Sequence, residues 1–453
     1  MRFTDAFKLT LSEASRLIRA NELSPTELLE SLLQRIDRLE PKLEAWVTID
    51  RDGAMATAKR YSKEAAEGRL RGPLHGIPVG LKDIFYTKGL KTTAGSKILA
   101  DFVPAYDATT VSRLKEAGAI ILGKTETTEF ASFDPAPTRN PWNTDHTPGG
   151  SSSGSAAAVS SGMCPAALGS QTGGSTLRPA AYCGIVGLKP TYGRVSRFGV
   201  YPLSWCLDHV GILTRTVEDA SVLLEVLAGH DPKDTASSIL TVPSYRRALD
   251  SLSPPELGLL REFFYDNASV EVRENLEEVT ERLGKAGAEV VEARLPKSFA
   301  VVHAAHRTLM IAEAAAVHEE TFRTRMADYR VKLRGMIAAG LLVPASTYLK
   351  AQRIRSQFTR EIAVALKRFD CLMMPATSGP APRGLESTGD PAFNSPWSFC
   401  GFPSIAVPSG LTKDGLPLGI QLVGRPFEEE VVLGAARWCE RIIGFGHGPH
   451  DPK

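Results

Sequence analysis

The stretch that decides the fold is PGGSSSGSAAAVSSGMCPAALGSQTGGSTLRPAAYCGIVGLKPT, residues 148–191. It holds two Gly- and Ser-rich turns. The first turn runs into small residues typical of a helix start, and the second follows the short apolar run ALGS. A flexible Gly/Ser linker would not need two such turns inside an apolar framework. The pattern therefore indicates a folded strand-and-helix segment whose turns approach a ligand closely.

The second turn has the composition of an oxyanion site. Successive backbone N–H groups of Thr172, Gly173, Gly174 and Ser175 can point into one concavity, which suits the negative charge that develops during acyl transfer. Ser175 is then the candidate nucleophile. None of the nine histidines stands in a recognisable partner arrangement with it, so another group must take its proton.

The chain around this segment alternates between short apolar runs and helical patterns. From residue 73 on, runs such as IPVGL and AIILG are separated by segments like 108–117, which favours an α/β domain. Two amphipathic helices are expected first, over residues 11–20 and 24–38, with Ser24 as the N-cap before Pro25.

The second half of the chain is expected to be a helical cover over about residues 254–375. It opens with a strand-helix-strand unit at 257–266, 272–287 and 289–296. The strand-like runs CGFPSIAVPSGL and GLPLGIQLVGRP then rejoin the first sheet. No internal repeat or clear linker divides the chain, so we expect one domain over residues 1–453.

Composition limits the partners. The chain has 453 residues, 43% of them hydrophobic and 23% charged, with a net charge of +2, so no field of one sign attracts nucleic acid or an acidic membrane. No run of 18 apolar residues and no signal-peptide pattern is present, so neither a membrane span nor a signal peptide is expected. The six cysteines have no metal-ligand spacing and read as reduced thiols, which predicts a cytoplasmic protein. They are Cys164, Cys183, Cys206, Cys371, Cys400 and Cys439.

Several ordered motifs resemble the amidase signature family. Besides the two turns, they are GPLHGIPVGLKDIF (72–85), GKTETTEFA (123–131), NPWN (140–143), YCGIVGLKPTYGRVS (182–196) and LDHVG (207–211). The resemblance implies a single α/β domain with a large mixed sheet flanked by helices, and a signature core over about residues 72–211. It also implies hydrolysis of a C–N bond without a cofactor or metal.

Carried over residue by residue, the resemblance places the nucleophile on Ser175, a bridging serine after a cis peptide on Ser151, and the catalytic lysine on Lys82. A lysine buried in an apolar stretch can lose its charge, because desolvation disfavours the ionised form. Neutral Lys82 would accept a proton from Ser151 while Ser151 accepts one from Ser175. The alternative for Lys82 is an ion pair with the adjacent Asp83.

The chain departs from the family pattern at two places. The family has Asp four residues before the nucleophile and Arg two after it, where this chain has Gln171 and Leu177. Both charges are replaced together, which avoids stranding one of them, and Arg178 follows directly. Ser153 replaces a family glycine and creates a formal G-x-S-x-G match, which nominates Ser152 as nucleophile with His447 or His450 as base. The Pro-, Asn- and Gly-rich residues 138–150 argue against the strand that such an elbow needs.

Other groups have plainer interpretations. His303 and His306 have H-x-x-H spacing, yet no carboxylate motif accompanies them, so a packed or solvated helix face is favoured over a metal site. Core packing is likewise expected for Trp397, Phe399 and Phe402, with a substrate pocket as the alternative.

We therefore predict an amidohydrolase that acts on a small amide, aryl amide or carbamate/urethane. It would act through an acyl-enzyme on Ser175, with Thr172, Gly173 and Gly174 at the oxyanion. It would need neither nucleic acid nor membrane, and could form a homodimer. The rival hypothesis is the A subunit of a tRNA-dependent amidotransferase, a family member that works in a complex and passes ammonia to a charged tRNA. The stretch YGRVSRFGV (192–200) looks like that protein, whereas Gln171 and Leu177 do not. A non-catalytic scaffold is disfavoured by the intact serine and lysine set.

Overall fold

The computed structural model describes residues 3–249, 253–446, 448 and 450–452. Within them the chain forms an 11-stranded mixed sheet with strand order β1-β3-β2-β4-β6-β5-β10-β11-β9-β7-β8. The strands are β1 (Trp46–Ile49), β2 (Pro78–Lys82), β3 (Ile120–Thr125), β4 (Ala166–Gln171), β5 (Val186–Lys189), β6 (His209–Thr214), β7 (Glu256–Leu260), β8 (Glu289–Ala293), β9 (Cys371–Pro375), β10 (Ser404–Leu411) and β11 (Pro417–Val423).

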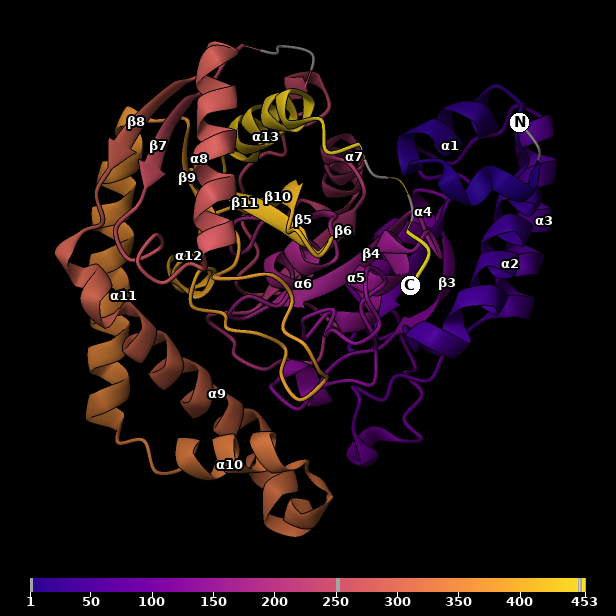
Figure 1. The fold of residues 1–453 in the computed structure, drawn as a ribbon. Coiled ribbons are helices and arrows are strands. Elements are labelled where there is room, and N and C mark those ends of the chain that lie inside the picture. Colours follow the sequence, from indigo (N-terminus) through magenta and orange to yellow (C-terminus); the bar gives the residue numbers. More distant parts are fainter. Residues whose placement is uncertain (1–2, 250–252, 447, 449, 453) are drawn as a thin grey trace.

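Helices lie on both faces of this sheet and beyond its ends (Figure 1). α5 and α6 pack on one face, and α7, α8 and α13 pack on the other. The helices are α1 (Leu11–Arg19), α2 (Pro25–Leu43), α3 (Arg51–Ala66), α4 (Thr109–Glu116), α5 (Ser153–Ser160), α6 (Leu177–Tyr182), α7 (Val217–Leu227), α8 (Val270–Lys285), α9 (Val302–Arg325), α10 (Val331–Gly340), α11 (Ala345–Ala365), α12 (Ser395–Cys400) and α13 (Glu429–Ile443).

The single α/β domain with a mixed sheet that the resemblance implied is confirmed. β2, β3 and β4 pair in parallel, whereas β4, β6, β5, β10 and β11 follow one another as antiparallel neighbours. β10 and β11 do rejoin the first sheet, through the pairing of β10 with β5. Strands from the far end of the sequence thus lie inside the sheet, between β5 and β9.

The N-terminal helices begin where their caps predict. Ser24 accepts a hydrogen bond from the Glu27 backbone N–H, and the Glu27 side chain accepts one from the Ser24 backbone N–H. α2 then runs through Pro41 to Leu43, farther than the sequence pattern indicated.

The region expected to be a helical cover divides into two parts. Its first part, β7, α8 and β8, is the predicted strand-helix-strand unit, and it extends the sheet edge, with β7 and β8 parallel. Only α9, α10 and α11 stand away from the sheet, as the lower left of Figure 1 shows. We call these three helices the helical cover from here on.

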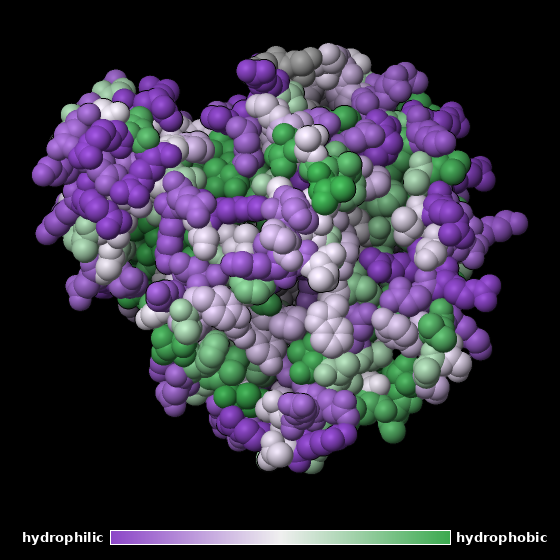
Figure 2. Space-filling view, turned by 180° about the vertical axis from the view of Figure 1, so that it is seen from behind, coloured by the Kyte–Doolittle hydropathy of each residue, from purple (hydrophilic) through white to green (hydrophobic). Residues whose placement is uncertain are grey.

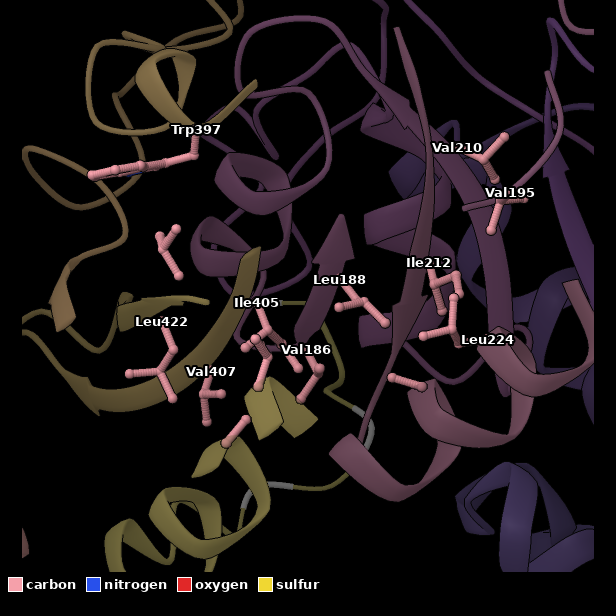
Figure 3. Close-up of a cluster of buried hydrophobic side chains, with 14 of the residues drawn as sticks. Val186, Leu188, Val195, Val210, Ile212, Leu224, Trp397, Ile405, Val407 and Leu422 are labelled. Atoms are coloured by element: carbon pink, nitrogen blue, oxygen red, sulfur yellow. The ribbon is translucent and has the colours of Figure 1, made fainter. Parts of the chain in front are cut away.

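The main core lies between the sheet and its helices. Figure 3 shows Val186 and Leu188 of β5, Ile212 of β6, and Ile405 and Val407 of β10 converging in one apolar layer. These side chains are at most 1% exposed. Seen from behind, the outer surface is largely hydrophilic, with apolar side chains in scattered groups (Figure 2). No helix within the described residues is long and apolar enough to span a bilayer.

Candidate active site

The site forms where two neighbouring parallel strands end. β2 and β4 pair in register, with Leu81 opposite Leu168, so their carboxyl ends lie at the same edge of the sheet. Lys82 is the last residue of β2, and Ser170 stands near the end of β4. Carboxyl ends of parallel strands are where α/β proteins bind ligands.

Lys82 is completely buried, and among the described residues its amine hydrogen-bonds to hydroxyl groups only. Its Nζ lies 2.6 Å from Ser151 Oγ and 2.8 Å from Ser170 Oγ. Burial holds the pKa of Lys82 well below its ordinary value, and the charge of Asp208 only partly offsets this. A lysine in such surroundings can be neutral and act as a base.

The proposed alternative, an ion pair between Lys82 and Asp83, is wrong. The Asp83 carboxylate instead lies 3.6 Å from Lys124 Nζ and accepts hydrogen bonds from the backbone and side chain of Thr93. Adjacent residues of an extended chain point to opposite sides, which separates Lys82 from Asp83.

Ser151 sits in a turn just before α5, and its peptide bond with Gly150 is cis, as expected. The carbonyl oxygens of residues 149–151 each accept a hydrogen bond. The Gly149 oxygen accepts from Ser153 Oγ (2.7 Å), the Gly150 oxygen from Arg178 Nη2 (2.6 Å), and the Ser151 oxygen from the Thr128 N–H (3.3 Å). Ser153, which replaces a family glycine, therefore has a structural partner.

Ser175 stands at the opposite turn, between β4 and α6, and lines a cavity of about 920 Å³. It is 9% exposed, so its hydroxyl can be reached from that cavity. The two turns are joined through Ser152, whose N–H donates to the Ser175 carbonyl at 3.3 Å. Within the described residues Ser175 Oγ makes no hydrogen bond to Ser151, a looseness common in unliganded sites.

The turn that carries Ser175 presents free backbone donors. The N–H groups of Gly173, Gly174 and Ser175 find no acceptor among the residues that the structure describes. Backbone N–H groups are nearly always paired, so three unpaired ones in a row beside a cavity fit an oxyanion. Thr172, just before them, is held by its other groups: its side chain donates to Asp208 Oδ1 at 2.6 Å, and its carbonyl accepts from His306 Nε2 at 2.9 Å.

Gln171 takes over the bracing of this turn without a charge. Its Oε1 accepts from the backbone N–H groups of Thr176 and Leu177, both at 3.0 Å, which caps the first turn of α6. Its Nε2 donates to Ser398 Oγ, which in turn donates to the Gly173 carbonyl. The Leu177 side chain packs in a small apolar cluster away from these groups.

The cavity is shared by the signature core and the helical cover. α9 supplies His303, His306, Arg307 and Met310, and α10 supplies Met336. His303 donates to the Ala392 carbonyl and His306 to the Thr172 carbonyl, so both rings anchor loops, and burial lowers the pKa of His306 to about 4. Among the described residues no group of three His, Cys, Asp or Glu side chains could hold a metal.

The Ser152 hypothesis fails on geometry. Ser152 is fully buried, its Oγ bonds the backbone of Ser170, and residues 138–150 form no strand. His450 stacks on Trp142 at the surface of the fold, and His447 lies outside the described residues. Trp397, Phe399 and Phe402 are core residues at most 2% exposed, and Phe393 rather than any of them lines the cavity.

Sequence reasoning assigned no contact to four residues around the site: Ser170, Asp208, Arg178 and Ser398. Asp208 stands in LDHVG, a motif recognised without assigning it a contact. Ser170 could have been found from the alternation of β4, which points it to the same side as Leu168. Nothing local marks Ser398, because it reaches Gly173 only through the fold.

Comparisons with known proteins identify the family and support the fold. The Amidase family model matches residues 27–433. The A subunit of glutamyl-tRNA(Gln) amidotransferase from Geobacter metallireducens is 40% identical, covering 97% of this chain and 98% of its own. Among solved structures, one from a vestigial complex that reveals the origins of an s-triazine catabolic enzyme has a TM-score of 0.90 at 31% identity, covering 96% of this chain and 99% of its own. The peptide amidase PAM has a TM-score of 0.85 at 32% identity, covering 97% and 99%.

Proposed function

The chain belongs to the amidase signature family, whose enzymes act on C–N amide bonds, and on that premise we propose that it cleaves an amide through an acyl-enzyme on Ser175. One observation carries the proposal. Lys82 is fully buried, and within the part of the chain that the structure describes its hydrogen-bond partners are hydroxyl groups alone. Its Nζ lies 2.6 Å from Ser151 Oγ, and the turn of Ser151 adjoins that of Ser175. The other buried lysines of the sheet have structural partners instead, a carboxylate for Lys124 and backbone carbonyls for Lys189.

The reaction follows from the positions of these groups. Ser175 Oγ attacks the amide carbonyl while its proton passes to Ser151 and the Ser151 proton passes to Lys82. The N–H groups of Gly173 and Gly174, with that of Ser175, stabilise the oxyanion; Thr172, expected at this position, contributes by fixing the turn through Asp208. The relay then returns a proton to the leaving nitrogen, and water hydrolyses the ester.

Covalent labelling tests the assignment of the nucleophile. A fluorophosphonate should modify Ser175, because the reagent needs an activated serine that can be reached from the cavity. Peptide mass spectrometry of the labelled protein identifies the site, with Ser175→Ala as the unlabelled control. An adduct on Ser152 would overturn the mechanism.

The setting of this chemistry is a second question, and the relatives favour the rival hypothesis over a free small-amide hydrolase. We propose glutamine as the amide donor and a role as the A subunit of an amidotransferase, as the relatives' name suggests. The cavity suits an amino acid amide, since Arg307 has no partner among the described residues and could meet a carboxylate while Asp390 meets an ammonium. Carbamates and urethanes remain alternative substrates.

Ammonia release separates the two settings. The purified chain is incubated alone with L-glutamine, with anilide chromogens and with carbamate chromogens, and ammonia or dye is measured. Turnover of chromogens without partners would select the free hydrolase. The chain can also replace the A subunit in a reconstituted Glu-tRNA(Gln) amidotransferase. A rise in glutamine hydrolysis in that complex would select the amidotransferase. A charged tRNA would then be a partner, although the near-neutral net charge of the chain had argued against nucleic acid.

A further inference from the structure

Arg178 is a buried cation close to the proposed relay. It stands on α6, three residues after Ser175, and is only 2% exposed. Its Nη2 donates to the Gly150 carbonyl at 2.6 Å and to Thr388 Oγ1 at 3.2 Å. The same side chain thus touches the Ser151 turn and the loop between β9 and α12.

This arginine is poorly compensated. Within the described residues no carboxylate lies within ion-pair distance of Arg178, and its Nε and Nη1 find no acceptor. Burial lowers the pKa of Arg178, and the charges of Tyr182 and Asp390 offset this only in part. A buried cation without an ion-pair partner destabilises the folded state. Stability therefore does not explain why an arginine stands at position 178.

Gly150 gives the arginine a place in the relay. The Gly150 carbonyl belongs to the peptide unit that leads into Ser151, so holding the oxygen fixes the rotation of that unit and the direction of the Ser151 side chain. The neighbouring carbonyls are held by Ser153 and Thr128. Three hydrogen bonds thus fix the carbonyls of this turn, and of these the one from Arg178 comes from α6, the helix that follows Ser175.

We propose that Arg178 is a positioning residue of the proton relay, which holds Ser151 in line between Lys82 and Ser175 by fixing the Gly150 carbonyl to α6. The inference rests on the proposed function, since it presumes that Ser151 passes a proton. It predicts that Arg178 acts on the chemical step rather than on substrate affinity.

Steady-state kinetics on the amide that the wild-type chain hydrolyses tests this. Arg178→Met should lower kcat about 100-fold, because a small misplacement of a relay group is enough for that, while KM changes less than about threefold. Arg178→Lys keeps one donor of similar reach and should recover kcat to within about tenfold of wild type. If Arg178→Met does not fold, Arg178→Gln is tested in its place with the same expectation.

A matched control separates positioning from damage to the core. Arg194 is another buried arginine, 2% exposed, whose Nε lies 3.4 Å from Glu429 far from the relay. Arg194→Met should lower the melting temperature and leave kcat per active site unchanged. Both variants are compared at equal concentrations of folded protein, measured by size-exclusion chromatography and circular dichroism, so that unfolded protein does not contribute to either comparison.

The outcomes are distinct. A wild-type chain that neither hydrolyses an amide nor labels on Ser175 would refute the proposed function itself. A wild-type chain that does both, with wild-type kcat in folded Arg178→Met or Arg178→Gln, would refute the positioning role alone. A raised KM with unchanged kcat would also overturn it, since Arg178 would then bind substrate.

Discussion

The signature core and the helical cover meet at the same cavity but are built in different ways. In the core, Lys82, Ser151 and Ser170 are at most 7% exposed, and Lys82 donates hydrogen bonds to both serines. The cover contributes Arg307 with no partner among the described residues, and its helices expose large apolar side chains such as Leu349 of α11. The hydrogen-bonded groups of the core fix the geometry of the chemical step. Residues of the cover that line the cavity without such partners can be replaced without disturbing that geometry, so they can determine which substrate binds. Substitutions in the core should therefore act on kcat, and substitutions in the cover on KM.

The largest effect is expected in the core. Ser175→Ala should lower kcat about 10⁴-fold or more, since the acyl-enzyme can no longer form. The melting temperature should stay within about 2 °C, because the hydroxyl makes no hydrogen bond among the described residues. Turnover assays and a thermal melt measure both. Residual activity near wild type would place the nucleophile elsewhere.

Two buried lysines on adjacent strands sharpen the comparison within the core. Lys82→Met should lower kcat about 10³-fold with a small change in stability. Lys82→Arg should fail as well, because guanidinium does not deprotonate. Lys124→Met should do the opposite, lowering the free energy of unfolding by about 3 kcal/mol by leaving Asp83 unpaired, with kcat per active site within about threefold. Urea unfolding and kinetics on the same preparations distinguish the two patterns.

The pH profile tests the charge state of Lys82. Its pKa is lowered by burial, so Lys82 is neutral above that pKa and protonated below it. Only the neutral amine accepts a proton, so kcat/KM should fall along a single ionisation as the pH drops and level off as it rises. Burial also raises the pKa of Glu126 to about 7, so Glu126→Gln is the control and should keep the acid limb. Loss of the limb in that variant would assign it to Glu126.

Gln171 should show a moderate effect, since it braces the oxyanion turn without entering the reaction. Gln171→Met removes the acceptor of the Thr176 and Leu177 N–H groups and should lower kcat about tenfold. Gln171→Asp should also be harmful, because it buries a charge and loses the donor to Ser398. Adding Leu177→Arg should rescue little, since the Leu177 side chain packs in the apolar cluster. A double-mutant cycle measures the coupling.

The smallest effect is expected in the cover. Arg307→Ala should raise KM for an anionic amide such as glutamine about tenfold, with kcat within about twofold, because it removes one exposed charge from the cavity wall. A neutral anilide serves as the comparison substrate and should show no change. An equal effect on both substrates would mean that Arg307 shapes the cavity rather than reading charge.

Much of the chemistry was determined by the sequence itself. Local patterns are enough for capping boxes, for the alternation of strands and helices, and for ordered Gly- and Ser-rich turns, because each depends on residues close together in the chain. The motifs from residue 72 to 211 accordingly predicted the fold class, and the structure brings Lys82, Ser151 and Ser175 to one edge of the sheet.

Only the tertiary structure decided which groups support these three. Ser398 of α12 and His306 of α9 both hydrogen-bond to the turn that carries Ser175, and Thr388 accepts a hydrogen bond from Arg178. All three lie more than a hundred residues along the chain from the groups they contact. The partner of Asp83 could not be read locally either, since Lys124 comes from the neighbouring strand β3. Contacts of this kind depend on how the strands and loops pack against one another, and no periodicity within a single segment carries that information.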